Sequence, residues 1–220
     1  MYINSAAVHA RQEEKEAALQ EAQGVVLLEG VSCDEDPAWT LELLQRAAPT
    51  VERLEVRNPG EPHLRAAHAA MPRLRRLCVT CHDGHDHGAA QDAAPPELNG
   101  ALPPGHSGLQ WLRVWGLPRT ALQSLLRAHS GTLEELQLHV GARGERGWPY
   151  NCSDLHSLLG PCGLRALRTL VLRRWGCIPT DIGGCEMQRA AVRAALPPGV
   201  QVLCSECDRL MVVTRGRHLV

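Results

Sequence analysis

Two C-x-x-C pairs, Cys78/Cys81 and Cys204/Cys207, have the residue types and spacing to attach haem or to bind a metal ion. Cys78, Cys81 and His82 spell C-x-x-C-H, the sequence to which c-type haem is attached. We do not favour haem, because Cys78 and Val79 also fit a repeated strand phrase and the N-terminus contains no secretory signal core. We therefore interpret the C-x-x-C-H match as part of a strand and not as a haem attachment site.

A local metal site is a second interpretation of the same region. Thiolate and neutral imidazole are ligands that Zn²⁺ prefers, and four of them lie close together in the sequence. They are Cys81, His82, His85 and His87. The favoured alternative is a solvated His/Asp loop that bends at its glycines, so we predict no metal and no cofactor.

Two C-x-x-C pairs, Cys78/Cys81 and Cys204/Cys207, also raise the question of a shared Cys₄ zinc site. Each pair follows the central leucine of its own unit, and the units lie four strands apart. With about 4.8 Å between neighbouring strands, the pairs would be separated by about 19 Å. Zinc–sulfur bonds of about 2.3 Å cannot span that distance, so with this repeat register we predict that the two pairs do not share an ion.

Composition and motifs favour binding over catalysis. Apolar residues make up 44% of the 220, and the formal net charge is −1, which suits a globular domain and argues against nucleic acid or a membrane surface as partner. The nine cysteines are interpreted as mostly free thiols of an intracellular protein, cytoplasmic or nuclear. Phosphate-binding, zinc-protease and serine-hydrolase motifs are missing, so we predict that the chain is not an enzyme.

The elements that position these residues follow a repeated phrase. It runs apolar-x-x-Leu-x-apolar, and each copy predicts a short buried strand. The five copies are Val51–Val56, Leu74–Val79, Leu109–Val114, Leu133–Leu138 and Leu167–Leu172. Weaker copies at Val25–Leu28 and Val200–Cys204 open and close the series.

Helical patterns alternate with these strands. They are predicted at Pro37–Ala48, His63–Ala70, Thr120–His129, around Leu155–Leu159 with Ser153 or Asp154 as cap, and at Glu186–Leu196. Strands that alternate with helices indicate parallel pairing, because each crossover returns the chain to the same edge of the sheet.

The phrase, its spacing and the alternation resemble the leucine-rich region of F-box/leucine-rich-repeat proteins and the related ribonuclease-inhibitor-like arrays. Four segments carry the resemblance: Leu54–Pro59, Leu74–Val79, Leu112–Leu117 and Leu133–Leu138. It implies an α/β leucine-rich-repeat horseshoe, with a parallel sheet on the concave side and helices on the convex side.

The predicted organisation has three parts. Residues 1–24 form a charged N-terminal helix or cap, and residues 25–210 form the leucine-rich-repeat domain. Within that domain, residues 80–107 and 140–152 are insertions, and residues 211–220 form a C-terminal tail.

The resemblance also implies a use. In that family an F-box docks on the adaptor of a cullin ubiquitin ligase, and the repeats hold the substrate. Residues 1–24 contain no recognisable F-box, so binding to the adaptor is expected only if one is encoded upstream. We therefore predict a non-catalytic protein–protein interaction module, with substrate recognition for an SCF-type ubiquitin ligase as one use. The alternative is a stand-alone repeat scaffold or inhibitor-like protein.

The predicted binding face is the concave side of the sheet. Alternation along the strands sends the residues beside each central leucine to that side. The candidate partner-binding residues are Arg53, Arg57, Arg76, Trp111, Arg113, Trp115, Gln137, His139 and Arg173. Trp and Arg are enriched at interaction hot spots, so an acidic or aromatic-bearing protein partner is expected. In the alternative, residues 80–107 cover Trp111 and Trp115.

Overall fold

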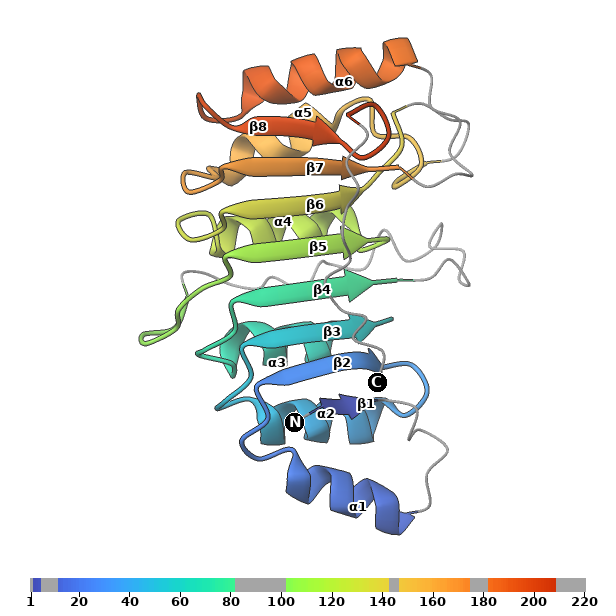
Figure 1. The fold of residues 1–220 in the computed structure, drawn as a ribbon, viewed down its shortest axis with the longest axis vertical. Helices are drawn as coiled ribbons and strands as arrows, with labels where there is room; N and C mark the ends of the chain where they lie inside the picture. The colour runs from blue at the N-terminus through green and yellow to red at the C-terminus, as the bar shows by residue number, and fades with distance from the viewer. Residues whose placement is uncertain (1, 5–11, 82–101, 143–146, 175–181, 209–220) are drawn as a thin grey trace.

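Eight parallel strands form one open sheet in the order of the chain (Figure 1). The computed structural model describes residues 2–4, 12–81, 102–142, 147–174 and 182–208. The strands are β1 (Tyr2–Asn4), β2 (Leu27–Ser32), β3 (Arg53–Arg57), β4 (Arg76–Thr80), β5 (Trp111–Trp115), β6 (Glu135–His139), β7 (Thr169–Arg173) and β8 (Gln201–Cys204). The predicted α/β class and single parallel sheet are confirmed.

The repeated phrase sets the register of the sheet. Its five central leucines pair across neighbouring strands in one row: Leu54, Leu77, Leu112, Leu136 and Leu170. All five are at most 3% exposed. A row of aligned leucines buries each strand against its neighbours and against the helices, so the phrase specifies both the pairing and the buried face.

Helices connect most of the strands; in Figure 1 α2 to α5 lie behind the sheet, whereas α1 and α6 lie beyond its two ends. They are α1 (Gln12–Glu21), α2 (Pro37–Ala47), α3 (Glu61–Ala69), α4 (Arg119–Ala128), α5 (Leu155–Leu159) and α6 (Ile182–Ala195), with a short 3₁₀ turn at Gly160–Cys162. The start of α2 shows the local cause: Pro37 occupies the first turn, and Asp36 Oδ1 accepts a hydrogen bond of 3.1 Å from Trp39 N.

The core lies between the helices and the facing side of the sheet. On β5, Leu112 and Val114 are 0% and 2% exposed, whereas Trp111, Arg113 and Trp115 alternate with them and are half-buried. The latter three belong to what we call the outer face, the side of the sheet turned away from the helices. The predicted alternation is therefore present.

Some predicted segments differ from the structure or fall outside it. The N-terminal region forms α1 as expected, but it also contributes β1, which pairs with β2 and which the sequence did not predict. Between β4 and β5, the described residues 102–110 contain no helix. Residues 82–101, 143–146 and the tail at 211–220 lie outside the described residues. In the described segments, no helix is both long and apolar enough to cross a membrane.

Candidate functional site

Five side chains form a continuous ladder across the outer face, from β4 to β7. The Arg76 guanidinium lies 4.4 Å from the centre of the Trp111 ring, a cation–π geometry. Trp111 Nε1 donates to Glu135 Oε1 at 2.9 Å, and Gln137 Nε2 donates to the same oxygen at 2.7 Å. Arg173 Nη1 then donates to Gln137 Oε1 at 3.0 Å. We call Arg76, Trp111, Glu135, Gln137 and Arg173 the outer ladder.

A second group lies next to the ladder, nearer the carboxyl ends of the strands. The Trp115 and His139 rings stack with centroids 5.2 Å apart and an interplanar angle of 12°. Arg113 Nε donates to His139 Nε2 at 3.2 Å. Burial, followed by the charges of Arg113 and Arg173, lowers the pKa of His139 to about 3. His139 is therefore neutral near pH 7 and serves as a hydrogen-bond acceptor.

Seven of the nine predicted binding residues belong to these two groups, and the other two lie beside them. Arg53 and Arg57 are exposed on β3, where Arg53 pairs in register with Arg76. Glu135, which connects Trp111 to Gln137, was not among the predicted binding residues, although strand alternation places it on the same face. Its register opposite Trp111 is the signal that could have identified it.

The predicted Cys/His metal group falls mostly outside the described residues. His82, His85 and His87 all lie there. Cys81 is described and half-buried, and its backbone N–H donates to Trp115 O at 2.8 Å. That hydrogen bond extends the pairing of β4 with β5.

The two C-x-x-C pairs are far apart, as predicted. Cys78 lies in β4 and Cys204 in β8, with three strands between them in the sheet. A zinc ion bound by both pairs is therefore excluded by the order of the strands.

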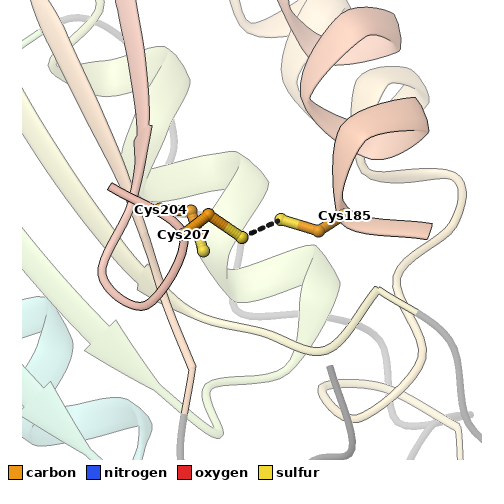
Figure 2. A group of neighbouring side chains, drawn as sticks. All are labelled: Cys185, Cys204 and Cys207. Carbon is orange, nitrogen blue, oxygen red and sulfur yellow. Dashed lines mark hydrogen bonds between the residues drawn. The ribbon is translucent and has the colours of Figure 1, made fainter. Parts of the chain in front are cut away.

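Cys204 and Cys207 instead meet a third cysteine, Cys185 of α6 (Figure 2). The three Sγ atoms all lie within 4.8 Å of one another, and the Cys207 thiol donates to Cys185 Sγ at 3.6 Å. Cys185 and Cys204 are buried, whereas Cys207 is exposed. We call these three residues the cysteine cluster.

The sequence analysis did not assign Cys185 to any site. The sequence feature that could have identified Cys185 is its position in the strand–helix order. It lies in the first turn of α6, and Cys204 ends the strand that follows that helix. A helix and the strand after it run in opposite directions in such a unit, so the start of one lies beside the end of the other. Cys185 and the C-x-x-C pair therefore share one edge.

Two of the three thiols, Cys204 and Cys207, have shifted pKa values. Burial raises the pKa of Cys204, but hydrogen bonds from the backbone N–H groups of Cys207 and Glu206 and from the two other thiols bring it below its usual value. Although Cys207 is exposed overall, desolvation of its sulfur, together with its hydrogen bonds to Cys185 and Cys204, raises its pKa to about 12. Of these two thiols, Cys204 is therefore the one that ionises more readily.

A buried polar network supports the cluster from behind. Arg174 is 6% exposed, and its guanidinium donates to Val140 O, to Gln188 Oε1 at 2.6 Å and to Cys185 Sγ at 3.5 Å. Gln188 Nε2 in turn donates to Gly141 O at 3.0 Å. Among the described residues, no carboxylate forms an ion pair with Arg174.

Comparison of the chain with protein families, with curated proteins and with solved structures finds no match.

Proposed function

We propose that this chain is a leucine-rich-repeat protein that binds another protein, without catalysis, on the outer face of its sheet. The observation that carries the proposal is the outer ladder and the adjoining Arg113/Trp115/His139 group. Together they place tryptophan and arginine, the residue types enriched at hot spots, side by side across four strands. The aligned leucine row and the strand–helix alternation support the repeat assignment.

The arrangement of the ladder favours tight binding because its side chains are already held in place. Trp111 is fixed between the Arg76 guanidinium and the Glu135 carboxylate, and His139 stacks on Trp115. Side chains that are ordered before binding lose less conformational entropy when the partner docks. Trp111 and Trp115 remain half-buried, so each keeps surface that a partner would cover.

The charge of the face favours an acidic partner. Five arginines lie along it, from β3 to β7: Arg53, Arg57, Arg76, Arg113 and Arg173. The Glu135 carboxylate, which accepts hydrogen bonds from Trp111 and Gln137, offsets part of that charge, and so does Glu55 on β3. A partner that presents carboxylates beside an aromatic or apolar group would complement this surface.

Two uses of such a module fit the family that the sequence resembles. One is recognition of substrates for an SCF-type ubiquitin ligase, in the cytoplasm or nucleus, with an F-box supplied upstream. The other is a stand-alone scaffold or inhibitor-like protein with no role in a ligase. The same surface serves both, so the partner and not the fold distinguishes them.

Affinity capture from a cell lysate tests the binding proposal, with the double variant Trp115→Ala/Arg113→Glu beside the wild type. The matched control is Arg65→Glu, which makes the same charge change on α3, where the Arg65 side chain is 61% exposed. Proteins bound by the wild type and by Arg65→Glu should be depleted roughly tenfold or more from the double variant. Equal capture by a folded double variant would remove the outer face as the binding surface.

The captured material also separates the two uses. The ligase role requires the cullin adaptor to be enriched with the longest expressed form of the protein, whereas the scaffold role requires binding partners without the adaptor. Because the adaptor would bind an upstream F-box, its recovery should not change in the double variant.

A further inference from the structure

We propose that Cys185, Cys204 and Cys207 bind one Zn²⁺ through three thiolates, with water or another small donor in the fourth position. The site lies where the start of α6 meets the end of β8 (Figures 1 and 2). It would fasten the last helix of the described chain to the last strand. The inference is independent of the protein-binding proposal, because it uses different residues.

The spacing of the sulfur atoms fits a metal ion. Tetrahedral zinc with Zn–S bonds of about 2.3 Å places its sulfur ligands about 3.8 Å apart. Cys207 Sγ and Cys185 Sγ are 3.6 Å apart, and all three sulfurs lie within 4.8 Å of one another. A covalent disulfide needs an S–S separation of about 2.05 Å, so this arrangement is that of three neighbouring thiols and not of a bonded pair.

The turn that carries two of the ligands is held by hydrogen bonds within the chain itself. Cys204 and Cys207 have the C-x-x-C spacing common in zinc sites. Asp208 closes the turn in both directions: its N–H donates to Cys204 O at 3.1 Å, and its Oδ2 accepts from Cys204 N at 2.7 Å. An ion pair of 2.9 Å with Arg189 of α6 holds Asp208 in place. Ligands held in this way need little reorganisation to bind the ion.

Arg174 provides an observation independent of the sulfur geometry. Its guanidinium is buried, contacts Cys185 Sγ at 3.5 Å, and forms no ion pair with a carboxylate of the described chain. A buried cation is costly without a nearby anion. Zn²⁺ with three thiolates carries a net charge of −1, which would supply that anion. The hydrogen bond from Arg174 would also orient Cys185 as a ligand.

The donor set determines which metal is expected. Three soft thiolates without a carboxylate select Zn²⁺ or Cu(I) over Mg²⁺, Ca²⁺ and Mn²⁺, which prefer oxygen ligands. The C-x-x-C spacing of Cys204 and Cys207, which is common in zinc sites, favours Zn²⁺. Co²⁺ should occupy the same site and report its geometry optically.

Metal analysis of the full chain, purified under reducing conditions and with any affinity tag removed, tests the proposal. We expect about one Zn²⁺ per chain in the wild type and in Cys78→Ser, a control thiol on β4. Cys207→Ser, at an exposed position, should bind zinc roughly tenfold or more weakly. Zinc content that is the same in Cys207→Ser as in the wild type would overturn the site.

A titration of the wild type with Co²⁺ keeps the test valid even if a variant misfolds. The thiolate-to-cobalt charge-transfer absorption grows with the number of sulfur ligands, and three per ion are expected together with the visible bands of tetrahedral cobalt. Fewer than three thiolates per Co²⁺, or no binding by the reduced protein, would overturn the proposal. So would loss of zinc on replacing His82, His85 and His87 by alanine while Cys207→Ser retains it.

Discussion

At the scale of single residues, His129 shows how burial turns a titratable group into a structural acceptor. It is 4% exposed, and its Nδ1 accepts a hydrogen bond of 3.1 Å from Leu109 N, just before β5. Its ring meets that of His68 edge to face, with centroids 5.4 Å apart. Burial, then the proximity of His68 and His106, lowers the pKa of His129 to about 3. The folded protein therefore needs this imidazole neutral.

This need predicts a pH dependence of stability. Unfolded histidine has a pKa of about 6.5, so between about pH 6.5 and 3 the unfolded chain binds a proton at His129 that the folded chain does not. The free energy of unfolding should therefore fall as the pH falls through that window. From pH 7 to pH 5 the wild type should lose about 2 kcal/mol more than His129→Gln.

Urea denaturation at pH 7, 6 and 5 measures this difference. His63 and His68 also have lowered pKa values because of burial, but they are present in both proteins, so the comparison isolates His129. Parallel pH profiles for the wild type and the variant would show that His129 does not carry the effect.

At the scale of the elements, the ends of β4 and β5 are joined so closely that one position requires glycine. Gly116 follows β5 with a φ of +69°, and a Cβ atom there would lie 2.4 Å from Cys81 O. The Cys81 N–H donates to Trp115 O just before it. The strand ends meet backbone to backbone, without room for a side chain.

Gly116→Ala should therefore destabilise the protein by about 2 kcal/mol or more, from the left-handed backbone and from the contact with a carbonyl oxygen that cannot move freely. Gly131→Ala is the matched control, because Gly131 has no positive φ and a Cβ there meets nothing within 4 Å. Urea midpoints for the two variants at one pH make the comparison. Equal stability of both variants would contradict this account of the turn.

The N-terminus of α5 shows a side-chain contact that the local sequence could not predict. Ser153 or Asp154 was predicted to cap the helix at Leu155–Leu159, and Asp154 does occupy the N-cap position of α5. Its side chain makes no capping hydrogen bond. It instead accepts two hydrogen bonds from Arg119 of α4, at 3.1 and 2.7 Å. Asp154 therefore pairs with Arg119 of a neighbouring helix and not with the backbone N–H groups of α5, and the local sequence cannot show this.

At the scale of the whole molecule, each strand pairs only with its neighbours in the chain (Figure 1). In the described part of the chain, the two ends of the sheet are linked through the strands and helices between them. If the chain is a repeat array, as we propose, its stability is set by local units and the interfaces between neighbours, and we expect the two ends to open separately.

Hydrogen exchange after a single core truncation tests this behaviour. Leu28→Ala in β2, where the leucine is 0% exposed, should cost about 2–5 kcal/mol and remove amide protection mainly from β1 to β3. Leu170→Ala, equally buried in β7, is the mirror control and should remove protection mainly from β6 to β8. Uniform loss of protection along the sheet in both variants would show a single cooperative unit.

The sequence by itself determined the strands β2 to β8, the positions of the helices and the buried face. The phrase apolar-x-x-Leu-x-apolar is local, and its leucines must leave water together, so it indicates which residues pair and which side of the sheet faces the helices. It also located the tryptophan and arginine residues of the outer face, because strand alternation has a period of two.

Only the tertiary structure decided how distant side chains meet. The position of Glu135 between Trp111 and Gln137, and of Cys185 beside Cys204 and Cys207, depends on the register and direction of elements that are far apart in the chain. The positions of these side chains are set by the packing of the whole molecule, whereas the strand phrases depend on local apolar spacing alone. The sequence determines which side chains are present, and the packing of the folded chain determines which of them come into contact.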